Sequence, residues 1–226
     1  MPDSRWERWG ATSGFGSLLF GAAAVAFERG PVVASDPAAK IVAHYTEFRT
    51  AMLWQALLFL LGSGVFLWFL GSLRSFLLRA ERGTGRLATV AFGAGVASTV
   101  ITVVALAFQI GLATAAKDAG QPAVVATMVA LFTVANLPLA VMLTAVAVTS
   151  FRTKAFPRWL GWLSAAAAVA QLIPALGIVL SSGPLAPDGW LAAYLPYPLY
   201  AVWLAAATVV MIRQLGRAAP AVIPSG

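Results

Sequence analysis

The chain contains no cysteine and only one histidine in its 226 residues. Without cysteine it cannot form a disulfide, a catalytic thiolate, an iron–sulfur cluster or a cysteine-ligated zinc site. The one histidine, His44, is too few for a histidine-based zinc site, which needs several protein ligands, and for a haem held by two histidines. A haem held by one axial histidine is an alternative, but the leading interpretation of His44 is a solvated side chain without a ligand. The sequence therefore predicts no bound metal and no covalent cofactor.

Charged residues are also scarce. They make up 10% of the chain, against about 25% in soluble domains, and hydrophobic residues make up 60%. Six apolar runs contain no Asp, Glu, Lys or Arg, and they cover residues 9–27, 51–73, 87–115, 123–150, 160–180 and 196–212. Most of them reach the roughly 20 residues that a helix needs to cross hydrocarbon. The sequence predicts an all-α polytopic transmembrane bundle of six helices, with residues 1–226 forming a single integral membrane domain.

The first apolar run follows Arg5 and Arg8 and in this respect is similar to a signal peptide. The run is longer than the usual hydrophobic region of a signal peptide. We therefore expect it to be retained as a membrane-spanning helix.

The basic residues are divided unequally between the two sides of such a bundle. If the N-terminus is cytoplasmic, eleven of the 15 Lys and Arg residues fall inside and four outside. The inner ones are Arg5, Arg8, Arg74, Arg79, Arg82, Arg86, Arg152, Lys154, Arg158, Arg213 and Arg217, and the outer ones are Arg29, Lys40, Arg49 and Lys117. Acidic residues favour the outer side, with Glu28, Asp36, Glu47, Asp118 and Asp188. Because cytoplasmic loops carry an excess of Lys and Arg, we expect both termini to be cytoplasmic. The net charge of +7 then indicates topology and contact with anionic membrane lipids, not nucleic-acid binding.

Aromatic residues gather near the ends of the predicted spans. Those at the inner boundary are Trp6, Trp9, Trp159 and Trp162, and those near the outer boundary are Trp54, Trp190, Tyr194 and Tyr197. Such rings prefer the headgroup level of a membrane, because one side is apolar and the other forms hydrogen bonds. We interpret them as membrane anchors.

The outer segment between the first two runs, residues 36–50, predicts an amphipathic extracytoplasmic helix. Asp36 is placed to cap it and Pro37 suits its first position. Apolar residues follow at three- and four-residue spacing, namely Ala38, Ile41, Tyr45, Phe48 and Met52, while Lys40, His44 and Glu47 fall on another face. The helix either lies on the membrane surface or forms a lid over a pocket. In the second case His44, Tyr45 and Glu47 are candidate ligand contacts.

Four amide side chains lie inside the predicted spans: Gln55, Gln109, Asn136 and Gln171. An amide in hydrocarbon needs a partner, so we expect all four to face the bundle interior and at least two to share one cluster. Pro138 follows Asn136 closely and Pro174 follows Gln171, so each amide is placed either to bond the carbonyl that a proline leaves free or to line a cavity. The four amides are thus either links between helices or the few polar contacts of an apolar, outward-opening pocket.

No span contains a charged residue, and this limits the possible functions. Proton-coupled carriers use ionisable groups within the membrane, and general acid–base catalysis needs positioned titratable groups. We therefore expect neither ion transport nor enzyme activity. Sodium sites built from carbonyls and hydroxyls alone stay open.

Several short motifs occur in order along nearly the whole chain. They begin at Arg5-Trp6-Glu7-Arg8-Trp9-Gly10, continue through Asp36-Pro37, Ile41-Val42-Ala43-His44-Tyr45 and Phe69-Leu70-Gly71-Ser72-Leu73-Arg74, and end at Pro157-Arg158-Trp159-Leu160-Gly161-Trp162. With them the chain resembles a family of small multi-span membrane proteins, common in high-GC bacteria, whose shared domain has no assigned function. The resemblance implies a bacterial inner-membrane protein with about six helices. It carries over no catalytic residues.

The leading interpretation is a non-enzymatic integral membrane protein that binds an apolar ligand, a lipid or a partner helix within its bundle. A small-solute transporter or permease is one alternative, and an accessory subunit of a larger membrane complex is another. The expected partners are membrane lipids, with a membrane-protein partner or a second copy of the chain also open. The expected location is the bacterial cytoplasmic membrane.

Overall fold

The computed structural model describes residues 4–30, 32–33, 35–115, 122–176, 178–179, 183 and 190–217. Within these ranges every regular element is a helix. Five helices are long and apolar enough to cross a membrane, namely α3 (Arg49–Glu81), α4 (Arg86–Thr114), α6 (Pro122–Thr153), α7 (Arg158–Leu176) and α9 (Pro196–Arg217). The prediction of an all-α fold with several helices able to cross a membrane is therefore confirmed.

Three other helices complete the described part of the chain. They are α1 (Ser4–Val25), α2 (Ala38–Glu47) and the short α8 (Trp190–Tyr194). Some of the residues that predict the membrane topology are not among those described. Lys117, Asp118 and Asp188 lie outside the described residues, as do the side chains of Arg5, Trp190 and Arg217.

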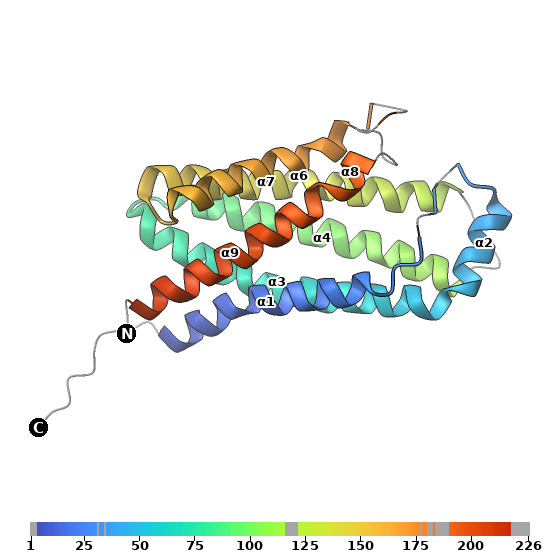
Figure 1. Ribbon diagram of the computed structural model, residues 1–226, viewed down its shortest axis with the longest axis horizontal. Coiled ribbons are helices and arrows are strands. Elements are labelled where there is room, and N and C mark those ends of the chain that lie inside the picture. Colours follow the sequence, from blue (N-terminus) through green and yellow to red (C-terminus); the bar gives the residue numbers. More distant parts are fainter. Residues whose placement is uncertain are drawn as a thin grey trace, which may run out of the picture.

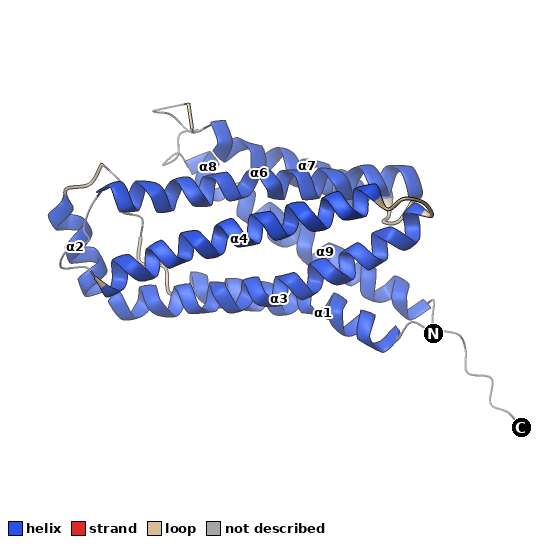
Figure 2. Cartoon of the chain, turned by 180° about the vertical axis from the view of Figure 1, so that it is seen from behind, coloured by secondary structure: helices blue, strands red, loops and turns tan. Residues whose placement is uncertain are grey.

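The long helices form a closed ring. α1 packs on α3, α3 on α4, α4 on α6, α6 on α7, α7 on α9, and α9 returns to α1 (Figure 1). Seen from behind, α4 lies between α3 and α6 (Figure 2). Neighbouring helices run antiparallel, so the start of α1 and the end of α9 lie at one end of the ring and α2 lies at the other.

The two ends of the ring differ in charge. One end holds the α3–α4 and α6–α7 turns, and we call it the basic end because of Arg79, Arg82, Arg86, Arg152, Lys154 and Arg158. The opposite end is called the α2 end. At the basic end the Arg79 guanidinium forms an ion pair with Glu7, which joins the start of α1 to the end of α3.

Aromatic packing holds the core together across three helices. Phe69 of α3 and Trp203 of α9 are fully buried and meet edge to face, with 6.4 Å between ring centroids. The Trp203 indole Nε1 donates to the Ser164 hydroxyl of α7 at 2.8 Å. A buried indole needs such an acceptor, so this bond fixes the positions of α7 and α9.

Small residues allow α1 to approach its neighbours closely. A Cβ atom at Gly10 would collide with the Ser72 side chain, and one at Gly14 would collide with Thr208 and lie 3.0 Å from the Phe69 ring. Close helix contact through glycine is a common way of packing helices in membranes, where burial of apolar surface provides little driving force.

The helices do not end where the apolar runs end. α3 continues to Glu81 instead of stopping at residue 73, because Phe76 and Leu77 beyond that point are still buried against the bundle. α7 ends at Leu176 instead of residue 180, two residues after Pro174. Beyond this point the Ile178 and Val179 amides donate to the carbonyls of Ala175 and Leu176, three residues earlier, so tighter turns follow the α-helix.

Candidate functional site

The four interior amides are all buried, with between 1% and 6% of their surface exposed. The prediction that they face inward is confirmed. They lie in two separate places: Gln55 and Gln109 near the α2 end, and Asn136 and Gln171 at the start of α9.

The first pair forms a hydrogen-bonded chain across three segments. Gln109 of α4 donates from Nε2 to Gln55 Oε1 of α3 at 2.8 Å and to the Met52 carbonyl at 3.2 Å. Gln55 in turn donates to the Glu28 carboxylate at 2.8 Å, in the segment that follows α1. The predicted shared cluster is therefore present between two amides, and its main role here is to link α1, α3 and α4.

Glu28 was expected only as a charge on the outer side. It is the first charged residue after the first apolar run, and Gln55 lies near the start of the next. Because α1 and α3 are antiparallel neighbours, these two positions lie at the same depth along the bundle axis. This equal depth is the signal in the sequence that would have identified Glu28 as a partner of Gln55.

α2 packs against the end of the bundle. Ile41 and Tyr45 are buried in one cluster with Met52, Leu112 and Val125, which belong to α3, α4 and α6. The two residues lie one helical turn apart, as their spacing predicts. Nearby, Arg49 Nε donates to the Ala113 carbonyl at 3.1 Å and so satisfies one of the free carbonyls at the end of α4.

The expected cap of this helix is wrong. Pro37 is the N-cap residue, not the first helical residue, and no side chain caps the helix there. Asp36 instead accepts from the Val33 amide at 3.1 Å and from Lys40 Nζ at 2.7 Å. Its carboxylate therefore stabilises the preceding turn and an ion pair. The Lys40 hydrogen bond is the main reason that the pKa of Asp36 is lowered.

The polar candidates on α2 have different surroundings. His44 contacts the rings of Tyr45 and Phe48 edge to face, while Glu47 is exposed. Partial burial lowers the pKa of His44, although the charges of Glu28 and Glu47 act in the opposite direction. Burial, assisted by the Glu28 charge, raises the pKa of Tyr45 to about 12. The Tyr45 hydroxyl lies 4.0 Å from the sulfur of Met128.

The second pair of amides meets the start of α9. Gln171 of α7 donates from Nε2 to the Pro196 carbonyl at 3.2 Å. Asn136 of α6 lies close to Tyr197, and donates to the carbonyls of Phe132 and Thr133 in its own helix at 2.9 and 3.3 Å. This place therefore joins α6, α7 and α9.

Neither amide bonds the carbonyl that its neighbouring proline leaves without a donor. Pro138 frees the carbonyl of Val134, four residues earlier, but Asn136 binds two other carbonyls. Pro174 frees the carbonyl of Ala170, but Gln171 reaches to α9. The prediction that these amides bond the carbonyls freed by the prolines is thus wrong.

The side-chain oxygen of Gln171, in this second pair of amides, has an unusual environment. Among the described residues, Gln171 Oε1 is buried and accepts no hydrogen bond. Exchanging the two carboxamide atoms would set an oxygen against the Pro196 carbonyl oxygen, so the bond to Pro196 fixes this orientation. The Thr208 hydroxyl of α9 is the other buried polar atom that lacks a hydrogen-bond partner among the described residues.

The chemistry of these places is that of amide hydrogen-bond donors and acceptors in apolar surroundings, joined at the first place by the Glu28 carboxylate. Across the residues that the structure describes, no group of three or more His, Asp or Glu side chains comes together. Comparison with known proteins adds no relative: no family model, no curated protein and no solved structure matches the chain.

Proposed function

We propose that this chain is a non-enzymatic integral membrane protein that binds an apolar ligand or lipid within its bundle, where α7 meets α9. The observation that carries this proposal is the buried Gln171 Oε1, which has no donor among the described residues. A buried acceptor without a partner costs about 1–3 kcal/mol. A ligand that brings one hydroxyl or N–H group would supply that donor.

The surroundings of Gln171 favour an apolar molecule. Leu172 and Leu176 on α7, and Leu195 and Tyr197 at the start of α9, are exposed. Large apolar side chains at the surface of a spanning bundle contact hydrocarbon. A long apolar molecule with a single polar group therefore fits better than a small hydrophilic solute. A membrane lipid with a free hydroxyl is the expected class.

We further propose six membrane crossings, with both termini cytoplasmic, in a bacterial inner membrane. α1 is 22 residues long and closes the ring between α3 and α9, which supports counting it as a sixth span. The excess of arginine at the basic end supports the orientation. Exposed Trp6, Trp9, Trp159 and Trp162 near that end support an interfacial belt.

In this topology α2 is an extracytoplasmic amphipathic helix. The burial of Ile41 and Tyr45 against α3, α4 and α6 supports a position over the end of the bundle, as opposed to one on the membrane surface.

The test is retention of a small molecule by the purified full-length chain. The protein is extracted in mild detergent, and bound molecules are identified by mass spectrometry. We expect the wild type to retain a hydroxyl-bearing apolar molecule and the Gln171→Met variant to lose it. The matched control is Gln109→Met, which removes another interior amide and should keep the molecule. Equal retention by all three proteins, or none by the wild type, would contradict the proposal.

A further inference from the structure

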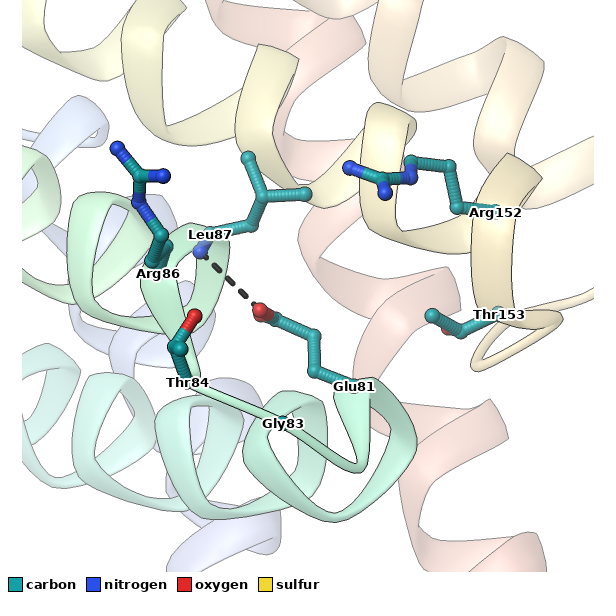
Figure 3. A pocket seen from close by; sticks show the side chains of 7 residues that line it. All are labelled: Glu81, Gly83, Thr84, Arg86, Leu87, Arg152 and Thr153. Atoms are coloured by element: carbon teal, nitrogen blue, oxygen red, sulfur yellow. Dashed lines mark hydrogen bonds between the residues drawn. The ribbon is translucent and has the colours of Figure 1, made fainter.

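A cavity of about 520 Å³ opens at the basic end of the ring. It lies between the α3–α4 turn and the end of α6 (Figure 3). Its lining residues are Glu81, Gly83, Thr84, Arg86, Leu87, Arg152 and Thr153. Two arginines and one carboxylate therefore face the same space.

The carboxylate is already used by the fold. Glu81 accepts from the Leu87 amide at 3.2 Å and from the Ala88 amide at 2.6 Å, the first of which is drawn in Figure 3. These amides are free donors at the start of α4, where the helix dipole also favours negative charge. Glu81 thus occupies the helix N-terminus, and any further anion in the cavity has to be held by other groups.

The two arginines are available for that role. Among the described residues, neither the Arg86 nor the Arg152 guanidinium lies within 4.0 Å of a carboxylate oxygen, whereas Arg79 at the same end pairs with Glu7. Arg152 extends across the cavity toward Leu87, and Arg86 lies on the opposite side of Leu87, with its side chain turned away from Arg152 in this structure (Figure 3). The Thr84 side chain, beside Arg86, offers a hydroxyl on the same side.

The turns next to the cavity contain two further basic residues in an unusual backbone conformation. Arg82 has φ 47° and Lys154 has φ 59°, which is the left-handed region. Glycine normally occupies such positions at helix ends, because a Cβ atom is disfavoured there. Each of these residues is adjacent in sequence to a lining residue, Gly83 or Thr153. Basic side chains thus occupy two backbone positions where glycine would be less strained. Both side chains add positive charge near the cavity.

We propose that this cavity binds the phosphate group of an anion, with Arg86 and Arg152 as its ligands and the Thr84 hydroxyl as an additional donor. A guanidinium matches phosphate through two parallel hydrogen bonds, and arginines from two different helices can grip one group from both sides. The same chemistry is offered by the headgroup of an anionic phospholipid and by free phosphate. The exposed Trp159 and Trp162 on α7, which follow the α6–α7 turn, place the cavity close to a membrane interface and favour the lipid.

The test uses native mass spectrometry of the full-length protein in detergent, titrated with phosphatidylglycerol or with phosphatidylcholine of the same acyl chains. A parallel arm measures the melting temperature with added inorganic phosphate. The cavity variant is Arg86→Gln with Arg152→Gln. Its matched control, Arg8→Gln with Arg213→Gln, also removes two exposed arginines but neither of them lines the cavity.

We expect the cavity variant to bind phosphatidylglycerol roughly tenfold more weakly or worse, and the control to bind like the wild type. If instead inorganic phosphate raises the melting temperature of the wild type but not of the cavity variant, the site holds phosphate and its source is free anion. Equal weakening in both variants, or binding of both anions that is unchanged in the cavity variant, would overturn the proposal.

A second variant covers the case in which the first does not fold. Arg86→Lys with Arg152→Lys keeps both charges but loses the planar fork of the guanidinium. We expect weaker binding of phosphatidylglycerol here too, by several fold. Full binding by this folded variant would show that net charge alone attracts the lipid, and would also reject the assigned ligands.

Discussion

Gln109 Nε2 lies 2.8 Å from Gln55 Oε1, so the second and third long helices of the chain, α3 and α4, are joined by an amide–amide hydrogen bond near the α2 end. Both side chains are buried, and Gln55 continues the chain to the Glu28 carboxylate. Because each interior donor of this pair has an acceptor, we interpret it as a structural link. The buried amide oxygen that has no donor among the described residues is Gln171 Oε1, at the start of α9.

Changing Gln109 to Leu should destabilise the protein. The substitution leaves Gln55 Oε1 without its donor, which should cost about 1–3 kcal/mol. Thermal or denaturant unfolding in detergent measures this loss. The double variant Gln55→Leu with Gln109→Leu should lose less than the sum of the two single variants, because it removes both partners. Additive losses would argue against a specific bond, and loss of retained lipid in Gln109→Leu would argue against a purely structural role.

Changing Gly14 to Ala should loosen α1 from the ring. The new Cβ would collide with Thr208 and crowd the Phe69 ring, and overpacking of this kind typically costs about 1–3 kcal/mol. Gly21→Ala in the same helix is the control, since nothing lies within 4 Å of a Cβ atom there. We expect the control to be neutral or slightly more stable, because alanine favours helix. Equal melting temperatures of the two variants would contradict this packing of α1.

The stability of the protein should depend on pH through His44. Partial burial lowers the pKa of His44 below its ordinary value of 6.5, so the unfolded chain takes up this proton at a higher pH than the folded protein. Stability should therefore be fully present above about pH 6.5 and should fall as the pH drops from there toward the folded-state pKa. Asp36 acts in a lower window, because its lowered pKa removes stability only as the pH falls below 3.8.

Melting temperatures measured between about pH 7.5 and 5.5 test this expectation. The His44→Gln variant should show a smaller decrease over this range than the wild type. If the two proteins lose stability equally, His44 does not carry the dependence.

Single cysteines in this cysteine-free chain report topology. With a membrane-impermeant thiol reagent on intact cells, we expect labelling of Glu47→Cys in α2 and not of Thr84→Cys in the α3–α4 turn. Both positions are exposed, so burial does not explain a difference. After the membrane is permeabilised, Thr84→Cys should react as well. Strong labelling of Thr84→Cys in intact cells would reverse the proposed orientation.

Local chemistry in the sequence predicted part of this arrangement. The absence of charge from long apolar runs predicted helices that can cross a membrane, and the cost of an unpaired amide predicted the burial of Gln55, Gln109, Asn136 and Gln171. The spacing of Ile41 and Tyr45 predicted a common face. Each of these inferences depends on residues within a single segment of the chain.

Relations between helices were harder to predict. Which amides meet depends on how each helix is rotated about its axis, so the separation into two pairs could not be predicted from four isolated positions. The Arg86–Arg152 cavity joins residues from two turns that are far apart in sequence. Asp36 was misassigned because two competing partners, the Val33 amide and Lys40, lie within reach of its short side chain.

The most direct test of the central claim is a high-resolution electron cryo-microscopy map of the chain in nanodiscs made from its native membrane. The account predicts elongated non-protein density against α7 and the start of α9, with a polar end within hydrogen-bonding distance of Gln171 Oε1. The same density should be absent from a map of Gln171→Met. A map in which Gln171 Oε1 accepts a bond from a protein group, with no non-protein density beside Gln171, would contradict ligand binding at this place.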